Sequence, residues 1–259
     1  MITLPADLVP GLEVETRKVV SLRPSRLLLA GPVAVGLVGT LITALVSGAA
    51  DPKGTPATGA ATIGLYLGIL AVLVAVTVLG VGATAGEYKR GSLALSLLFA
   101  PDRDRFLTAK YLTLGLMALF VALLTEIAST GVLLLGARGK FEFGAQFLQV
   151  VGAGLLAAVC WVIIGAGTGL LLRNVSTALI VLLGWAFVFE PLVWAVAGGV
   201  GLGGLCTLLP VSGTLAGVMA GSFPDSTLFA PAPAALVVLV FWATVAGAAG
   251  WWDLRRRDL

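Results

Sequence analysis

The sequence has no histidine, only two cysteines and few charged residues. Without an imidazole there is no Ser-His dyad and no histidine ligand for haem, and most zinc sites are excluded as well. Cys160 and Cys206 lie far apart in the chain, so there is neither a CxxC pair nor a disulfide framework. The absence of histidine therefore argues against enzyme chemistry that depends on an imidazole, and the two cysteines form no zinc or disulfide motif.

Apolar residues are plentiful instead: they fill 59% of the 259 positions and give a mean hydropathy of +1.06. Soluble domains are close to half apolar, so this chain has more apolar surface than a water-soluble core can hide. The apolar residues fall in blocks of about 20, which is the length that a helix needs to cross a hydrocarbon layer about 30 Å thick. The composition therefore predicts an all-α integral membrane protein.

Six such blocks are present, and none shows the period-two alternation of barrel strands. The first block begins only after Arg26, so no cleaved signal peptide is expected. We predict a single transmembrane domain over residues 1–259. Its six transmembrane helices are expected at residues 27–47, 62–85, 111–136, 147–172, 177–197 and 234–252.

Lysine and arginine are distributed unevenly between the two sets of helix ends. Thirteen lie on one side, and only Lys53, Arg138 and Lys140 lie on the other. The positive-inside rule places the richer side in the cytoplasm, so both termini of this multi-pass protein of the inner (plasma) membrane are expected there. The basic residues stand singly or in short groups at helix ends, which does not indicate nucleic-acid binding.

Two segments differ from simple membrane crossings. Residues 1–25 mix apolar and charged positions, which predicts an amphipathic entry helix on the inner membrane surface that Pro24 ends. Residues 198–223 are apolar, rich in glycine, uncharged and interrupted by Pro210. This second pattern predicts one or two short re-entrant helices on the outer side.

The longest predicted cytoplasmic loop has the clearest motif. An acidic residue leaves the second helix, an apolar stretch runs from Leu93 to Ala100, and a proline and mixed charges lead into the third helix. The pattern suits a short helix that docks on a soluble partner, and equally a solvated loop whose charges only set topology. Its charged and turn residues are Glu87, Gly91, Ser92, Pro101, Arg103, Arg105 and Lys110.

This loop resembles the ABC-2 type permease family, in which a Glu and a Gly-Ser/Thr step precede a leucine-rich stretch, a proline and arginine turn, and an Ala-Lys pair that opens the third helix. Glu13, Arg17 and Lys18 look like the amphipathic entry of the same family. Residues 198–223 are similar to its outer re-entrant element. The resemblance covers nearly the whole chain in architecture, although its motif residues are few.

The resemblance implies the transmembrane subunit of an ATP-binding cassette exporter. Such a subunit pairs with a second permease copy, identical or different, and each copy binds a separate nucleotide-binding subunit that holds ATP and Mg. The loop between the second and third helices would contain the coupling helix, and Glu13, Arg17 and Lys18 would also face that subunit. No cofactor is expected in this chain itself, which contains no Walker A sequence.

Two carboxylates lie inside predicted helices, Glu126 in the third and Glu190 in the fifth. Charges inside membrane helices usually face a cavity or pair with another group, so both are functional candidates. Glu190 also suits a structural role at the outer interface, and Glu126 suits a substrate path, a dimer seam or a bond to a neighbouring helix. With them we list as candidates for the substrate path Phe120, Thr125 and Ser129.

The candidate path is mainly apolar, which favours an amphipathic, drug-like or lipid-like cargo. The alternative function is a self-sufficient secondary transporter or channel without ATP coupling, in which the two intramembrane carboxylates carry protons. The two functions differ in whether a separate ATP-binding subunit accompanies the chain. A subunit that moves no cargo within an ABC-like complex is a further alternative.

Overall fold

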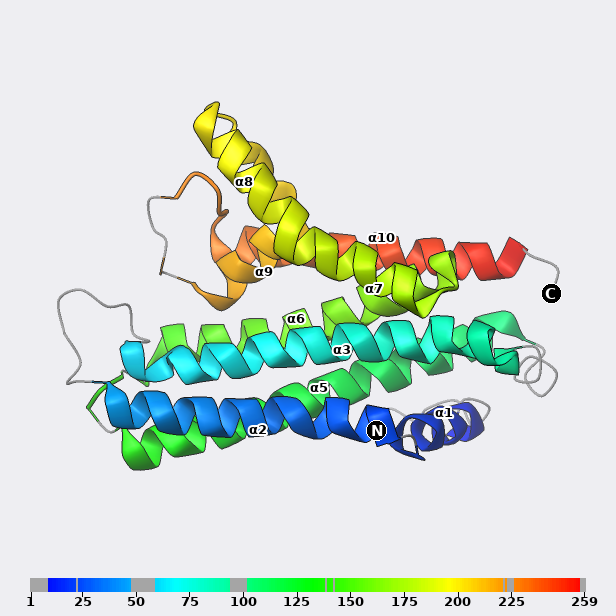
Figure 1. Cartoon of the computed structure of the whole chain (residues 1–259), viewed down its shortest axis with the longest axis horizontal. Helices are drawn as coiled ribbons and strands as arrows, with labels where there is room; N and C mark the ends of the chain where they lie inside the picture. The colour runs from blue at the N-terminus through cyan, green and yellow to red at the C-terminus, as the bar shows by residue number, and fades with distance from the viewer. Residues whose placement is uncertain are drawn as a thin grey trace.

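The computed structural model describes residues 9–21, 23–47, 59–93, 102–137, 139–141, 143–220, 222 and 226–256, and in this part all regular structure is helical. Figure 1 shows an elongated bundle in which most long helices run side by side. The long helices of the bundle are α2 (Arg23–Val46), α3 (Ile63–Arg90), α5 (Arg103–Gly136), α6 (Ala145–Leu172) and α10 (Ala232–Arg256). The short helix α1 (Val9–Ser21) precedes them, and the turn η1 (Ala60–Thr62) leads into α3.

Within the described residues, six helical stretches are long and apolar enough to cross a membrane, which confirms the predicted all-helical architecture at this level. They are Arg23–Val46, Ala60–Arg90, Arg103–Gly136, Ala145–Leu172, Val175–Gly199 and Ala232–Arg256. The third stretch begins eight residues before its apolar block because Asp102 caps it: the Asp102 carboxylate accepts hydrogen bonds from the backbone nitrogens of Asp104 and Arg105.

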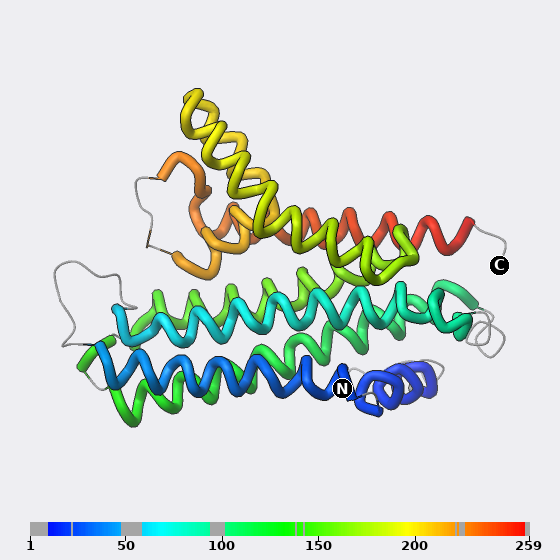
Figure 2. Tube along the Cα trace, viewed as in Figure 1, coloured from blue at the N-terminus to red at the C-terminus, as the bar shows by residue number. Residues whose placement is uncertain are grey.

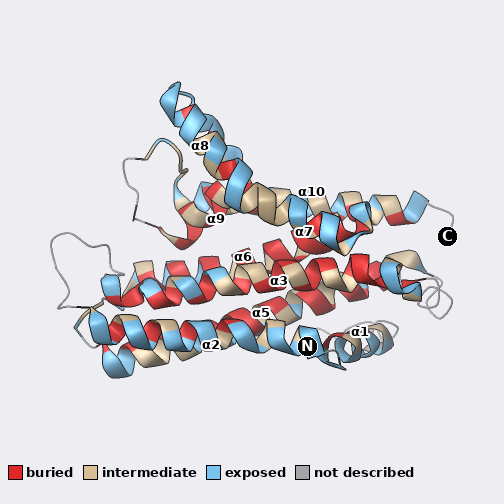
Figure 3. Ribbon diagram, in the orientation of Figure 1, coloured by how far each residue is buried: buried red, intermediate tan, exposed pale blue. Residues whose placement is uncertain are grey.

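The core of the bundle lies along α3 and α6. These two helices pack against each other, α3 also packs against α2, and α6 also packs against α10. More than half of the apolar window in each of α3 and α6 is buried, whereas only 22% of the window is buried in each of the outer helices α2 and α10. Figure 3 shows this contrast as a red centre with paler outer helices.

Glycines allow the closest approaches between helices. A Cβ added to Gly64 of α3 would lie 2.2 Å from the backbone nitrogen of Thr40 in α2. A Cβ added to Gly165 of α6 would lie 2.6 Å from the carbonyl oxygen of Thr77 in α3. Small residues at such positions let helix backbones pack directly on each other, which is how helices associate where no water drives them together.

The fifth long stretch leaves the bundle at an angle, as the yellow segment in Figures 1 and 2 shows. It consists of α7 (Val175–Gly184), the π-helical turn η2 (Trp185–Phe189) and α8 (Glu190–Gly199), instead of the uninterrupted helix predicted over residues 177–197. The wide turn is followed by Pro191, which has no N–H for the helical ladder. Local hydrophobicity does not show such an interruption.

Two short helices follow this stretch, η3 (Gly203–Leu208) and α9 (Pro210–Val218), within the segment where one or two were predicted. At the other end of the chain, α1 matches the position of the predicted amphipathic helix. Pro24, however, does not end α1, which finishes at Ser21; it lies in the first turn of α2, where proline fits because the N–H groups need no partner. The predicted coupling helix over Leu93 to Ala100 lies, apart from Leu93, outside the described residues.

Candidate functional site at the basic end of the bundle

The basic end of the bundle is the end at which α3 and α6 finish, α5 begins and α10 finishes, with α1 lying beside it (Figure 1). The described lysines and arginines gather there, with the exception of Lys140. Lys140 donates hydrogen bonds to the carbonyl oxygens of Ala44 and Ser47 at the last turn of α2, at the far end. The uneven distribution predicted from the sequence is therefore present in three dimensions among the described residues.

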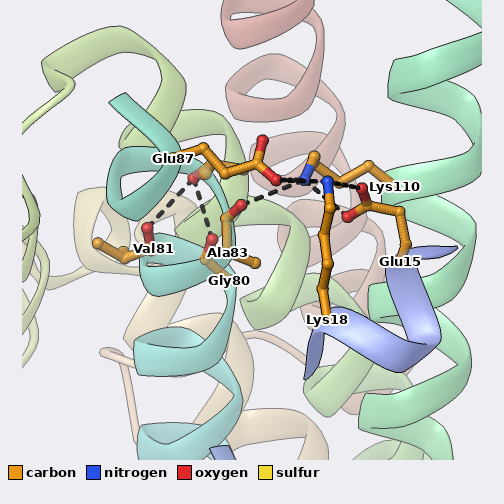
Figure 4. A network of polar contacts seen from close by, with 8 residues as sticks. Glu15, Lys18, Gly80, Val81, Ala83, Glu87 and Lys110 are labelled. Atoms are coloured by element: carbon orange, nitrogen blue, oxygen red, sulfur yellow. Dashed lines mark hydrogen bonds and ion pairs between the residues drawn. The ribbon is translucent and has the colours of Figure 1, made fainter. Parts of the chain in front are cut away.

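Four charged side chains from three helices form a closed network at the basic end (Figure 4). The Nζ of Lys110 in α5 lies 2.7 Å from Oε2 of Glu15 in α1 and 3.1 Å from Oε1 of Glu87 in α3. The Nζ of Lys18 lies 2.7 Å from Oε1 of Glu15 and 2.9 Å from Oε1 of Glu87. Each lysine thus contacts both glutamates, and we call these four residues the charge cluster.

The charge cluster is buried, which distinguishes it from an ordinary surface ion pair. Only 1% of the Lys110 side chain and 4% of the Glu87 side chain are exposed, whereas Lys18 reaches the surface. Lys110 also donates a hydrogen bond to the carbonyl oxygen of Ala83, and its Nζ lies 5.0 Å from the ring centroid of Phe106. Removing one partner from such a buried pair leaves an uncompensated charge and is strongly destabilising.

The electrostatic balance can be followed at the two members on α1. Burial acts to raise the pKa of Glu15, but Lys110 and Lys18 outweigh burial, and the pKa of Glu15 lies below its usual value. Burial likewise acts to lower the pKa of Lys18, but its hydrogen bonds to Glu15 and Glu87 raise that pKa above its usual value. Both shifts favour the charged forms, so the two residues stabilise each other as ions.

Local sequence explains how the charge cluster forms. Glu15 and Lys18 are three residues apart on α1 and therefore share one helix face with the buried Val19. Glu87 lies in the last turn of α3, which ends at Arg90 and is capped by Gly91, whose left-handed φ of 65° glycine adopts without strain. Lys110 lies in the second turn of α5 after the Asp102 cap. The segment between α3 and α5 is thus flanked on both sides by residues that hold α1.

Three of these four residues were predicted from the sequence as site residues, and Glu15 was not. Glu87, Lys18 and Lys110 come together, whereas Glu13 and Arg17 form an exposed pair with each other on another face of α1. Glu15 occupies the position in the site that the family resemblance predicted for Glu13. Its three-residue spacing to Lys18, next to apolar Val19, is the signal that identifies it.

Of the remaining loop candidates, Arg103 contacts the end of α10. Arg103 donates from Nη1 to the carbonyl oxygens of Leu254 at 2.9 Å and Arg255 at 3.4 Å. Arg105 pairs with Asp102 within the same turn. Ser92 directly follows the Gly91 turn, and Pro101 lies outside the described residues.

Glu190 is fully buried at the start of α8 and is surrounded by donors. Its carboxylate accepts hydrogen bonds from the backbone nitrogens of Val211 and Ser212, from the Ser212 hydroxyl, and from Nε1 of Trp185. The two backbone nitrogens belong to the first turn of α9, so the carboxylate binds a helix N-terminus, where negative charge is favoured. Through these hydrogen bonds Glu190 joins the start of α8 to the first turn of α9, and we call this contact the clamp.

Glu126 has the opposite surroundings. Its side chain is 2% exposed, and neither carboxyl oxygen has a hydrogen-bond partner among the described residues. A Cβ added to Gly154 of α6 would lie 2.3 Å from Oε1 of Glu126, so the carboxyl group rests on the bare backbone of α6. Thr125 and Ser129 are also buried and lie against Gly36 of α2.

The candidates for the substrate path therefore do not form one surface. Glu126, Thr125 and Ser129 lie inside the helix bundle, and Glu190 lies in the clamp on α9. Phe120 is 62% exposed and points away from the core.

In comparisons with known proteins, no family model and no curated protein matches the sequence.

Proposed function

We propose that this chain is the transmembrane permease subunit of an ATP-binding cassette exporter of the ABC-2 type. The observation that carries the proposal is the charge cluster, which joins the two sides of the loop between α3 and α5 to α1. A loop that receives force from a soluble subunit needs such a rigid attachment. The residues that make it are those of the motif with which the chain resembles the family, together with Glu15.

In this proposal a separate nucleotide-binding subunit holds ATP and Mg and presses on the loop between Gly91 and Asp102. Because Glu87 and Lys110 both bind α1, movement of the loop displaces α1, α3 and α5 together. The basic end faces the cytoplasm of a cell with the chain in its inner membrane, and both termini lie on that side. The chain itself contributes no ATP chemistry.

A second permease copy, identical or different, completes the path for the cargo. The exposed surface of α2 and α5 is rich in large apolar side chains, including Phe120, and faces lipid or the second copy. An amphipathic, drug-like or lipid-like cargo suits a path with such walls. Export would follow when ATP drives the nucleotide-binding subunits to close and the charge cluster transmits this movement to the helices of the permease pair.

The experiment that tests the proposal is a mild detergent purification of the tagged chain from its native membrane. We expect a soluble subunit with a Walker A motif to co-purify at about one copy per chain and to hydrolyse ATP. The Glu15→Gln variant should reduce hydrolysis stimulated by the permease, and the Glu13→Gln variant, at an exposed site on the same helix, should not. Recovery of the chain alone, with no ATP hydrolysis, would contradict the proposal.

A secondary transporter is the second candidate function, and Glu126 is the observation that favours it. A buried carboxyl group without a partner among the described residues is the kind of group that carries protons in transporters. The purified chain in liposomes distinguishes the two functions. Flux that follows an ion gradient without ATP, and that Glu126→Gln abolishes, would favour the secondary transporter.

A further inference from the structure

Helix α10 contacts both the start of α5, where the loop ends at the basic end, and the short helix α9, and α6 contacts the same two elements. Figures 1 and 2 show α10 lying along the bundle with its first turns next to α9, and hydrogen bonds join its last turns to the start of α5. Its first and last buried residues, Ala235 and Leu254, are 19 positions apart, which corresponds to about 28 Å along a helix. After Pro233 in its first turn, α10 contains no proline that would kink it.

At the basic end, two consecutive residues of α5 hold the last turns of α10. Arg103 donates to the carbonyl oxygens of Leu254 and Arg255, which have no partner within a helix that is about to end. The Asp104 carboxylate accepts a hydrogen bond from Nε1 of Trp251 at 2.8 Å and lies 3.4 Å from Nε of Arg255. Both residues directly follow Asp102, where the loop enters α5.

Apolar and charged contacts complete this junction. Leu254 is 1% exposed and belongs to a small buried cluster with Leu93, Phe106, Leu107 and Leu170. Phe106 is also the ring beside Lys110, so it connects the charge cluster to the end of α10. The Asp253 carboxylate lies 2.8 Å from Nη2 of Arg173, at the end of α6.

Toward the far end, α10 is packed directly on η3 and α9. Trp242 donates from Nε1 to the carbonyl oxygen of Leu208, the last residue of η3, at 2.8 Å. A Cβ added to Gly213 of α9 would lie 2.9 Å from the carbonyl oxygen of Ala235. A Cβ added to Gly217 would lie 2.5 Å from Cδ2 of Leu236. Such close packing leaves α9 little freedom to move independently of α10.

We propose that Arg103, Asp104 and Trp251 are positioning residues that make α10 a rigid link between the loop at the basic end and the clamp that Glu190 forms on α9. A displacement of the loop then moves the start of α5, the end of α10 and, through α10, the first turn of α9. The role of this link in transport rests on the proposed function, whereas the mechanical link is a property of the chain alone.

The test is hydrogen exchange measured by mass spectrometry on the purified full chain in lipid nanodiscs, without nucleotide or partner. The Asp104→Asn/Trp251→Phe variant removes a charge and an N–H donor but keeps the aromatic ring. We expect faster exchange in residues 247–256, where the junction is broken, and at least threefold faster exchange in residues 211–218 of α9, which pack on the other part of α10. Residues of α2, which packs on α3 and α5, should not change.

Arg17→Gln is the control, because Arg17 is exposed and its ion pair is with Glu13 on α1. It should alter neither the end of α10 nor α9. If the double variant does not give a monodisperse protein, Trp251→Phe alone should produce the same pattern with smaller changes.

Three outcomes would overturn the proposal. The first is faster exchange at residues 247–256 with none at residues 211–218, and the second is no change at either end. The third is an equal rise in α2, which would show a general loosening of the bundle. None of these outcomes depends on whether an ATP-binding subunit exists, so they are separate from a failure of the co-purification experiment.

Discussion

Glu13 and Glu15 show how strongly the surroundings of a residue decide its role. Both are glutamates on α1, two positions apart, but Glu13 pairs with Arg17 in solvent and Glu15 binds the buried Lys110. We expect Glu15→Gln to lower the free energy of unfolding by about 1–3 kcal/mol, because it leaves Lys110 with Glu87 as its one remaining carboxylate. Glu13→Gln should change it by less than about 0.5 kcal/mol. Thermal unfolding of both variants in detergent checks this, and equal midpoints would contradict it.

The pH dependence of the charge cluster follows from the two shifted groups on α1. The lowered pKa of Glu15 contributes stability that is present above its ordinary value of 4.5 and is lost as the pH falls through the lower value of the folded state. The raised pKa of Lys18 contributes stability that is present below 10.5 and is lost as the pH rises through the higher folded value. The difference in unfolding midpoint between the native chain and Glu15→Gln should therefore stay constant from about pH 6 to 8 and shrink below 4.5. A difference that shrinks already between pH 8 and 6 would contradict this assignment.

Glu190 and Glu126 provide a second contrast at the scale of single residues. The carboxylate of Glu190 accepts four hydrogen bonds, and that of Glu126 accepts none from the described residues. Glu190→Gln should speed hydrogen exchange at Val211 and Ser212 by about fivefold or more, because an amide cannot accept from all four donors. Glu126→Gln, the matched substitution, should leave those two amides unchanged. Equal effects of the two variants would show that Glu190 does not hold α9.

At the scale of helices, hydrophobic blocks predicted the number and order of the six long stretches because length and apolarity are properties of contiguous sequence. Their ends were less accurate, because α5 includes the charged turn from Arg103 to Lys110, whose charges are matched by distant residues. The π-helical turn before Glu190 was also missed, since the hydrophobicity of residues 177–197 is uninterrupted there. Glu15 was not predicted as a site residue because its partner Lys110 is 95 positions away in the sequence.

The packing of α3 against α2 can be tested with two glycines of the same helix. Gly64→Ala places a methyl group 2.2 Å from the backbone of Thr40, so it should destabilise the bundle by about 1–3 kcal/mol. Gly82→Ala meets nothing within 4 Å and should stabilise α3 by about 0.5–1 kcal/mol, the ordinary gain from replacing a helical glycine. Opposite shifts in the thermal midpoint are expected. Shifts of the same sign would contradict the close approach of α2 and α3.

At the scale of the whole molecule, the difference in basic residues between the two ends predicts the orientation of the chain in the membrane. This prediction does not depend on any partner. Both native cysteines, Cys160 and Cys206, are buried, so the chain offers a low background for labelling with a membrane-impermeant maleimide. Gly204→Cys introduces a thiol at an exposed site of η3, and Arg105→Cys introduces one at the basic end. With the basic end in the cytoplasm, intact cells should label Gly204→Cys and should label Arg105→Cys only after permeabilisation. The reverse pattern would place the charge cluster outside the cell, where no ATP-binding subunit reaches it. The proposed function would then fail, whereas the link from Asp104 through α10 to α9 would be unaffected.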